Sequence, residues 1–192
     1  MSSAGILILS APSGGGKTSL ARALAGSRDD AEITVSHTTR GQRPGEEHGV
    51  HYHFVDQPTF KAMIAEGQFI ECATVFDHYY GTSIAAIEKL ILHGKHAILD
   101  IDWQGAENVR KKYPAAKSVF VMPPSMEALE QRLRRRKQDS DRVIARRMQA
   151  ANNEMSHKDE FDAIIINDHF DRALAELESV LNGLESALQE SA

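Results

Sequence analysis

The sequence contains little cysteine and no long apolar run. Cys72 is the one cysteine among 192 residues, so neither an intramolecular disulfide nor a cysteine-based zinc site can form. No apolar run reaches the roughly 18 residues of a membrane span, and Met1 to Ala11 carries no basic leader. We therefore expect no membrane partner, no signal peptide and a location in the reducing cytoplasm.

An excess of basic residues is also missing. The chain has 27 Asp and Glu against 22 Lys and Arg, which gives a formal net charge of -5. Proteins that bind nucleic acid along their length usually show the opposite balance. We therefore expect no nucleic-acid partner, and we expect any bound phosphate to lie in a local basic pocket.

Short apolar runs alternate with helical patterns over most of the chain. Because the runs are continuous rather than alternating, they predict strands that are covered on both faces, as in a parallel sheet. The expected strands are Ile6 to Leu9, Ala97 to Ile101, Val119 to Met122 and Ala163 to Ile166. The expected helices are Thr18 to Leu24, Gln104 to Lys112, Ser125 to Arg135, Arg142 to Met155 and Phe170 to Leu188. This order predicts an α/β doubly wound core flanked by helices.

Residues 36–93 break this rhythm with several glycines and aromatic residues. We interpret them as an inserted lobe of short strands and small helices. The length of the chain favours one domain, 1–192, with a core formed by residues 1–35 and 94–192.

The last expected helix carries an apolar stripe of leucines at alternating steps of three and four. These leucines are Leu174, Leu177, Leu181, Leu184 and Leu188. Two heptads are too few to predict a coiled coil, so the stripe favours packing on the sheet. A seam in a homodimer is the alternative.

The segment Ile6 to Leu20 predicts a phosphate-binding loop between a strand and a helix. Gly16, Lys17 and Thr18 follow Ala11 at Walker A spacing, and glycines let backbone N–H groups converge on an anion. We expect ATP to bind along Ala11, Pro12, Ser13, Gly14, Gly15, Gly16, Lys17, Thr18 and Ser19. Ala11 replaces the commonest glycine, which is tolerable if its φ stays below zero.

Asp100 and Asp102 follow another apolar strand and resemble a Walker B motif. Because parallel sheets bind ligands at the carboxyl ends of their strands, Asp100 is expected near the loop. The Thr18 hydroxyl and Asp100 are our candidates for holding the Mg²⁺ that accompanies ATP. An ordinary strand end that leads into a solvated loop is the alternative.

A second phosphate site is indicated within the expected lobe. Arg40 and Arg43 lie three residues apart with Tyr52 shortly after, and guanidinium groups match phosphate oxygens bidentately. These residues form a candidate clamp for a monophosphate. A solvated charged loop is the alternative.

Taken in order, the motifs of this chain resemble those of guanylate kinases, over nearly its whole length. The shared motifs are Ser36-x-Thr-Thr-Arg40-x-x-Arg43-x-Gly-Glu46, Gly49-x-x-Tyr52-x-Phe54, Phe69-x-Glu71, Tyr80-Gly81, Leu99-Asp-Ile-Asp102 and Asn167-Asp168. The resemblance implies a nucleoside monophosphate kinase-like fold with a GMP-binding lobe and a short lid. It also implies that Arg40, Arg43, Tyr52 and Tyr80 hold the GMP phosphate, and that Ser36, Glu71, Thr82 and Asp102 surround the guanine. Threonine stands at position 82 where the family has serine, and both side chains carry a hydroxyl.

The resemblance also assigns residues near the transferred phosphoryl group. A basic segment of about residues 134–146 resembles the lid of the family, with Arg132, Arg136 and Arg147 at its basic positions. Lys17, Arg40, Arg136 and Arg147 would then stabilise the transferred group, while Arg132, Asn167 and Asp168 would contact ATP. A solvated helix face or an unrelated turn is the alternative for several of these residues.

The implied activity is direct in-line transfer of the terminal phosphoryl group of ATP to GMP, which gives ADP and GDP. Guanine offers ring N–H and amino donors to the carboxylates of Glu71 and Asp102, whereas adenine does not. A non-catalytic guanylate-kinase-like binding module and a P-loop kinase for another small phosphate ester are the alternatives.

Overall fold

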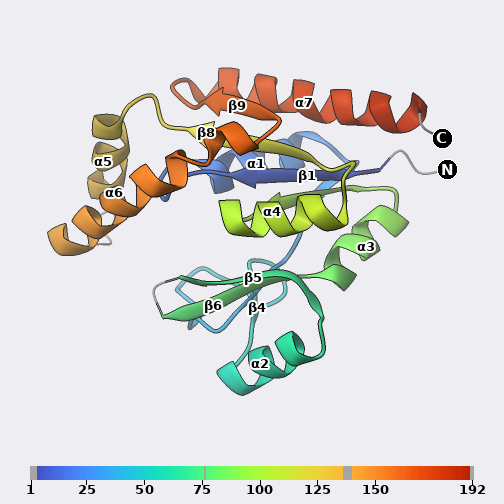
Figure 1. Cartoon of the computed structure of the whole chain (residues 1–192), viewed down its shortest axis with the longest axis horizontal. Helices are drawn as coiled ribbons and strands as arrows, with labels where there is room; N and C mark the ends of the chain where they lie inside the picture. The colour runs from blue at the N-terminus through green and yellow to red at the C-terminus, as the bar shows by residue number, and fades with distance from the viewer. Residues whose placement is uncertain (1–3, 76, 136–139, 191–192) are drawn as a thin grey trace.

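The computed structural model describes residues 4–75, 77–135 and 140–190. Within them, a five-stranded parallel sheet lies between two layers of helices (Figure 1). Its strands, in spatial order, are β2 (Ala31–Ile33), β7 (His96–Asp100), β1 (Ile6–Ser10), β8 (Lys117–Met122) and β9 (Ala163–Ile166). The sequence predicted four of these strands. It missed β2, because three residues are too short to show a pattern.

Apolar side chains cover both faces of this sheet. Leu7 and Leu9 of β1 point to one core cluster, which includes residues of α1 (Lys17–Ser27) and α7 (Phe170–Glu190). Ile6 and Ile8 point to the other, which includes residues of α3 (Ile84–Leu92) and α4 (Trp103–Lys112). The α/β fold with a parallel sheet between helices is therefore confirmed, and burial on both faces explains the continuous apolar runs.

The leucine stripe of α7 packs on the central sheet, as its spacing predicts. Leu177, Leu181 and Leu184 are buried in the same cluster as Leu7 and Leu9. Leu174 and Leu188 are partly buried against that cluster. None of the described helices, α7 included, is long and apolar enough to cross a membrane.

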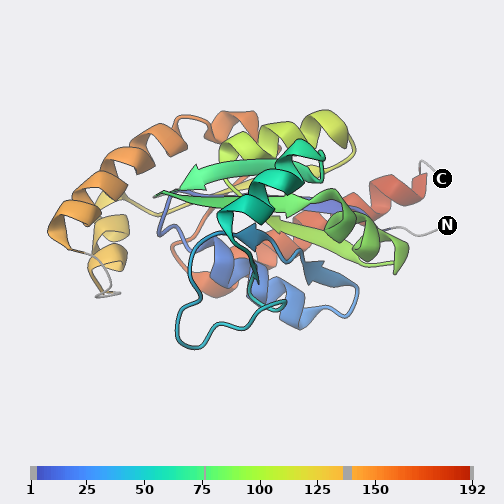
Figure 2. The same ribbon diagram turned by 90° about the horizontal axis from the view of Figure 1, so that it is seen from below.

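A second sheet lies below α4 in the view of Figure 1, and Figure 2 shows it from below. Its four described strands, in spatial order, are β4 (His53–Phe54), β3 (His37–Thr38), β6 (His78–Ser83) and β5 (Phe69–Val75). Helix α2 (Gln57–Ala65) is inserted between β4 and β5 in the chain. All of these elements lie within residues 36–93, although α3 of the same range packs on the central sheet. The division into core, lobe and lid stays a prediction.

Helices α5 (Met126–Arg135) and α6 (Asp141–Met155) project together at one end of the molecule (Figure 2). Arg134 links them, because its guanidinium contacts Glu130 at 2.8 Å and Asp141 at 2.5 Å. A short 3-10 helix, Lys158–Glu160, follows α6. Arg136 lies outside the described residues, as do residues 137–139 of the expected lid.

We predict that Leu181→Ala lowers the free energy of unfolding by about 2–5 kcal/mol, because it leaves a cavity between α7 and the sheet. Leu92→Ala is the matched control, since the Leu92 side chain is 84% exposed. Its effect should stay within about 0.5 kcal/mol. Urea denaturation of both variants measures the difference, and equal effects would contradict the packing of α7 on the sheet.

Candidate active site

The expected phosphate loop connects β1 to α1 in a conformation that depends on glycine. Gly14 and Gly16 have φ values of 95° and 97°, which favour glycine. A Cβ atom on Gly16 would lie 2.3 Å from Nδ2 of Asn167. Among the described non-glycine residues Asp77 alone has a positive φ, so Ala11 fits the loop without strain.

The loop lies beside Asp100 because β1 and β7 pair in parallel, with Leu9 opposite Asp100. Lys17 Nζ lies 2.7 Å from Oδ1 of Asp100 and donates to the carbonyl oxygen of Ile101, also at 2.7 Å. The Thr18 hydroxyl donates to Oδ2 of the same carboxylate at 2.5 Å. The Walker A and Walker B residues expected from the sequence thus meet at the carboxyl edge of the sheet.

Arg132 and Asn167 hold the outer side of the loop. The Arg132 guanidinium donates to the carbonyl oxygens of Gly15 at 3.3 Å and Asn167 at 2.6 Å. The Asn167 side chain donates to the Gly15 carbonyl at 3.0 Å. A pocket of about 450 Å³ adjoins them, and Gly16, Asp168 and Phe170 contribute to its lining. Arg132, Asn167 and Asp168 therefore lie together beside the loop.

Glu71 is a buried carboxyl group on the second sheet. It lies opposite Thr82 in the pairing of β5 with β6, and it is only 7% exposed. Burial raises the pKa of Glu71 to about 7. A hydrogen bond with Thr82 stabilises the charged form and acts in the opposite direction, but its effect is smaller than that of burial. The Thr82 hydroxyl also lies 3.1 Å from that of Ser36. Three of the four expected guanine-contacting residues therefore form one hydrogen-bonded group.

Helix α4 joins this group to the central sheet through its first turn. Asp102 is the N-cap residue of α4, and its Oδ1 accepts from the Gly105 N–H at 2.8 Å. A Cβ atom on Gly105 would lie 3.0 Å from Oε2 of Glu71. Neither the capping role of Asp102 nor the packing of Gly105 was expected from the sequence. The aspartate directly before a helical pattern was a readable N-cap signal, whereas nothing local marks Gly105 as a packing position.

The expected phosphate clamp is partly assembled. The Arg40 guanidinium lies 2.7 Å from Oε1 of Glu46 and 5.5 Å from the centre of the Tyr52 ring. The Tyr52 and Tyr80 rings meet edge to face at 5.9 Å. The Arg43 side chain is exposed, while its backbone N–H donates to Glu46 at 2.9 Å. Glu46 belongs to a sequence motif but had no expected role, and in the structure its carboxylate accepts from both Arg40 and the Arg43 backbone.

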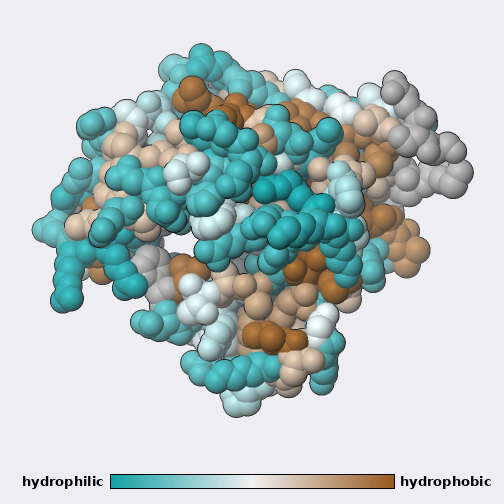
Figure 3. Space-filling view, viewed as in Figure 1, coloured by the Kyte–Doolittle hydropathy of each residue, from teal (hydrophilic) through white to brown (hydrophobic). Residues whose placement is uncertain are grey.

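One cavity of about 340 Å³ brings the two groups of residues together. The phosphate loop lines it with Ser36, Tyr52, Glu71, Tyr80, Asp100, Asp102 and Glu154, among others. The surface is hollowed between α6 and the second sheet, which both contribute to this lining (Figure 3). Glu154 was not expected here, because a single carboxylate late in a helix gives no local signal. Arg147 lies half-buried on the same helix.

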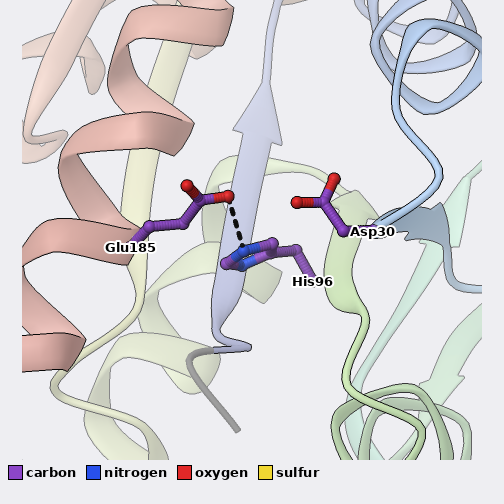
Figure 4. Close-up of side chains that lie close together, drawn as sticks. All are labelled: Asp30, His96 and Glu185. Atoms are coloured by element: carbon purple, nitrogen blue, oxygen red, sulfur yellow. Dashed lines mark hydrogen bonds and ion pairs between the residues drawn. The ribbon is translucent and has the colours of Figure 1, made fainter.

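A second cluster of titratable residues lies at the opposite edge of the central sheet. Its residue types are those of a metal site, but its hydrogen bonds are not. Asp30, His96 and Glu185 lie close together there (Figure 4). Nδ1 of His96 accepts from the Gly5 N–H at 3.0 Å, so Nε2 carries the proton and faces Glu185 at 3.1 Å. A metal-bound histidine instead donates its second N–H. Arg28 contacts both carboxylates and supplies the positive charge.

The fold and the cavity define a P-loop kinase-like protein. Its cavity is lined by the phosphate loop and by Ser36, Glu71 and Asp102, which form a second, hydrogen-bonding pocket. The family model described as guanylate kinase matches residues 3–184. The chain belongs to the guanylate kinase family.

Individual relatives agree with this assignment. A guanylate kinase of Legionella pneumophila (strain Lens) is 52% identical over 93% of this chain and 86% of its own length. One of Methylococcus capsulatus is 52% identical over 97% of this chain and 92% of its own. The crystal structure of guanylate kinase from Anaplasma phagocytophilum matches with a TM-score of 0.78 and 33% identity, over 96% of this chain and 88% of that one.

We predict that the burial of Glu71 makes stability depend on pH. Its folded-state pKa, about 7, exceeds the ordinary 4.5, so its protonated form is favoured in the folded state. The raised pKa therefore contributes to the free energy of unfolding. This stabilisation is fully present below pH 4.5 and is lost as pH rises through 7. Glu71→Gln should therefore be more stable than the parent at pH 8, by up to about 3 kcal/mol, and the difference should shrink toward pH 4.5.

Denaturation of parent and variant across this pH range is the measurement. Glu176→Gln, at an exposed position of α7, is the control and should show no such trend. A difference between parent and Glu71→Gln that stays constant with pH would contradict the raised pKa.

Proposed function

We propose that this chain transfers the terminal phosphoryl group of ATP to GMP, giving ADP and GDP. The observation that carries this proposal is that Lys17 of the phosphate loop and the buried carboxyl group of Glu71 line the same cavity. A phosphate loop alone indicates only that a nucleotide binds. The chemistry of the second pocket indicates which compound accepts the phosphoryl group.

The second pocket suits guanine. As carboxylates, Glu71 and Asp102 only accept hydrogen bonds, and guanine presents a ring N–H and an amino group as donors. One oxygen of Asp102 already accepts from Gly105, which leaves the other for the base. Ser36 can donate to the guanine carbonyl, and Thr82 orients both Ser36 and Glu71. Adenine would oppose an unprotonated ring nitrogen to a buried carboxylate, which is unfavourable.

The GMP phosphate would lie on the hydroxyl groups of Tyr52 and Tyr80 and on Arg40 and Arg43. Glu46 accepts a hydrogen bond from Arg40 at 2.7 Å, which orients the charged guanidinium group. Such a fork matches phosphate oxygens bidentately. The GMP phosphate is itself the nucleophile, so the protein needs no covalent intermediate.

Lys17, Arg136 and Arg147 would stabilise charge on the transferred group, with Arg40 at its acceptor side. Arg132, Asn167 and Asp168 would hold the nucleotide of ATP beside the loop. The donor set of Thr18 and Asp100 is all oxygen, as Mg²⁺ prefers. When bound with ATP, Mg²⁺ would neutralise charge on the phosphate oxygens. We expect ATP and GMP as the small-molecule partners, in the cytoplasm.

We predict that Lys17→Ala reduces kinase activity about a hundredfold or more, because it removes a positive charge from the transferred group. It also leaves Asp100 without this ion pair, so unfolding should be measured beside activity. Lys95→Ala is the matched control, since Lys95 pairs with Glu32 at an exposed position. A folded Lys17→Ala variant within about threefold of the parent would contradict the role of Lys17.

We predict that Glu71→Gln narrows the preference for GMP over AMP. The amide replaces one acceptor oxygen with a donor, so kcat/KM for GMP should fall at least roughly tenfold while activity with AMP stays low or rises. A coupled assay of ADP formation with each nucleoside monophosphate measures both. Glu176→Gln should leave the ratio unchanged. If Glu71→Gln also leaves it unchanged, guanine is read by Ser36 and Asp102 instead.

A further inference from the structure

Glu154 of α6 binds the phosphate loop directly. Its Oε2 accepts from the backbone N–H of Ser13 at 3.0 Å. The carboxyl group lines the cavity together with Lys17, Glu71 and Asp102. The N–H groups of such a loop are the donors that hold nucleotide phosphates. Glu154 thus places a carboxylate oxygen on a group that belongs to the phosphate cradle.

The surroundings of Glu154 fix it in this position. The His157 ring, just after α6, stacks on Trp103 of α4 with ring centres 3.4 Å apart and planes 8° apart. Ile144 and Ala151 of α6 are buried. Arg147 lies seven residues before Glu154, so the two side chains share one face of the helix. The contact with Ser13 therefore positions the face of α6 that also carries Arg147.

A bound triphosphate conflicts with this arrangement. ATP would bring several negative charges to the cavity, where Asp102 already adds one and Lys17 offers a positive charge. Burial raises the pKa of Glu154, which shows that the surroundings disfavour its charged form. A phosphate that accepted from the Ser13 N–H would compete with the Glu154 carboxylate for the same donor, and the like charges would repel each other.

We propose that Glu154 is a positioning residue that holds Ser13 of the phosphate loop and is displaced by the triphosphate of ATP. Its release removes one of the contacts that hold the end of α6, beside the stacking of His157 on Trp103, and so loosens the face of the helix that carries Arg147. This inference rests on the proposed function, because it takes ATP as the phosphoryl donor.

Calorimetric titration with the non-hydrolysable analogue AMP-PNP and Mg²⁺ tests the competition. Glu154→Gln keeps the size and an acceptor oxygen but removes the charge, and charge-assisted hydrogen bonds are about twice as strong as neutral ones. We expect its Kd for AMP-PNP to fall about fivefold or more. Glu176→Gln is the control for the loss of one carboxylate and should leave this Kd unchanged. An unchanged or higher Kd in Glu154→Gln would overturn the proposal.

Hydrogen exchange on the unmodified protein gives a second test, which does not depend on the variant folding. With AMP-PNP and Mg²⁺, the amides of the phosphate loop should gain protection while those near Glu154 in α6 lose it. Protection of both regions at once would overturn the proposal. Failure of the parent to bind AMP-PNP would instead contradict the proposed function, so the two failures can be told apart.

Discussion

The site depends on the contacts of the Asp100 carboxylate with Lys17 and Thr18. One of its oxygens lies 2.7 Å from Lys17 Nζ, and the other accepts from Thr18. Because Asp100 ends β7 and Lys17 begins α1, these bonds hold the phosphate loop against the edge of the sheet. They require β1 and β7 to be parallel neighbours, since only then do their carboxyl ends lie side by side. The buried leucine and isoleucine side chains of both core clusters hold β1 and β7 in this alignment.

Helix α4 connects the two sheets at the point where the two substrates would meet. Its N-cap, Asp102, lies directly after the strand that carries Asp100, and its first turn packs on Glu71 of the second sheet. Glycine at position 105 permits this approach, because a larger side chain would press on the carboxyl group. The spacing between the phosphate loop and the pocket that we propose for guanine is therefore set by one turn of helix.

The cavity gathers carboxyl groups at a cost to stability. Burial raises the pKa of both Glu71 and Glu154, so the charged form of each is disfavoured. The two carboxyl groups differ in what a substrate would do to them. Glu71 faces a pocket that suits a base, whose N–H groups would supply the donors that favour its charged form, whereas Glu154 already accepts from the phosphate loop and would lose that donor to a phosphate.

Local pattern in the sequence determined the parallel strands and the glycine-dependent loop, because each depends on residues close together in the chain. The order of the strands placed Asp100 near that loop, and the tertiary structure decided that the Lys17 and Thr18 side chains both contact its carboxylate. Resemblance to a family added Ser36, Glu71, Tyr80 and Thr82. Tertiary structure alone decided that Gly105 packs on Glu71 and that Glu154 reaches Ser13. The last pair is separated by 141 residues. Such contacts leave no periodic or local signal, because they arise only when packing brings distant segments to within hydrogen-bonding distance.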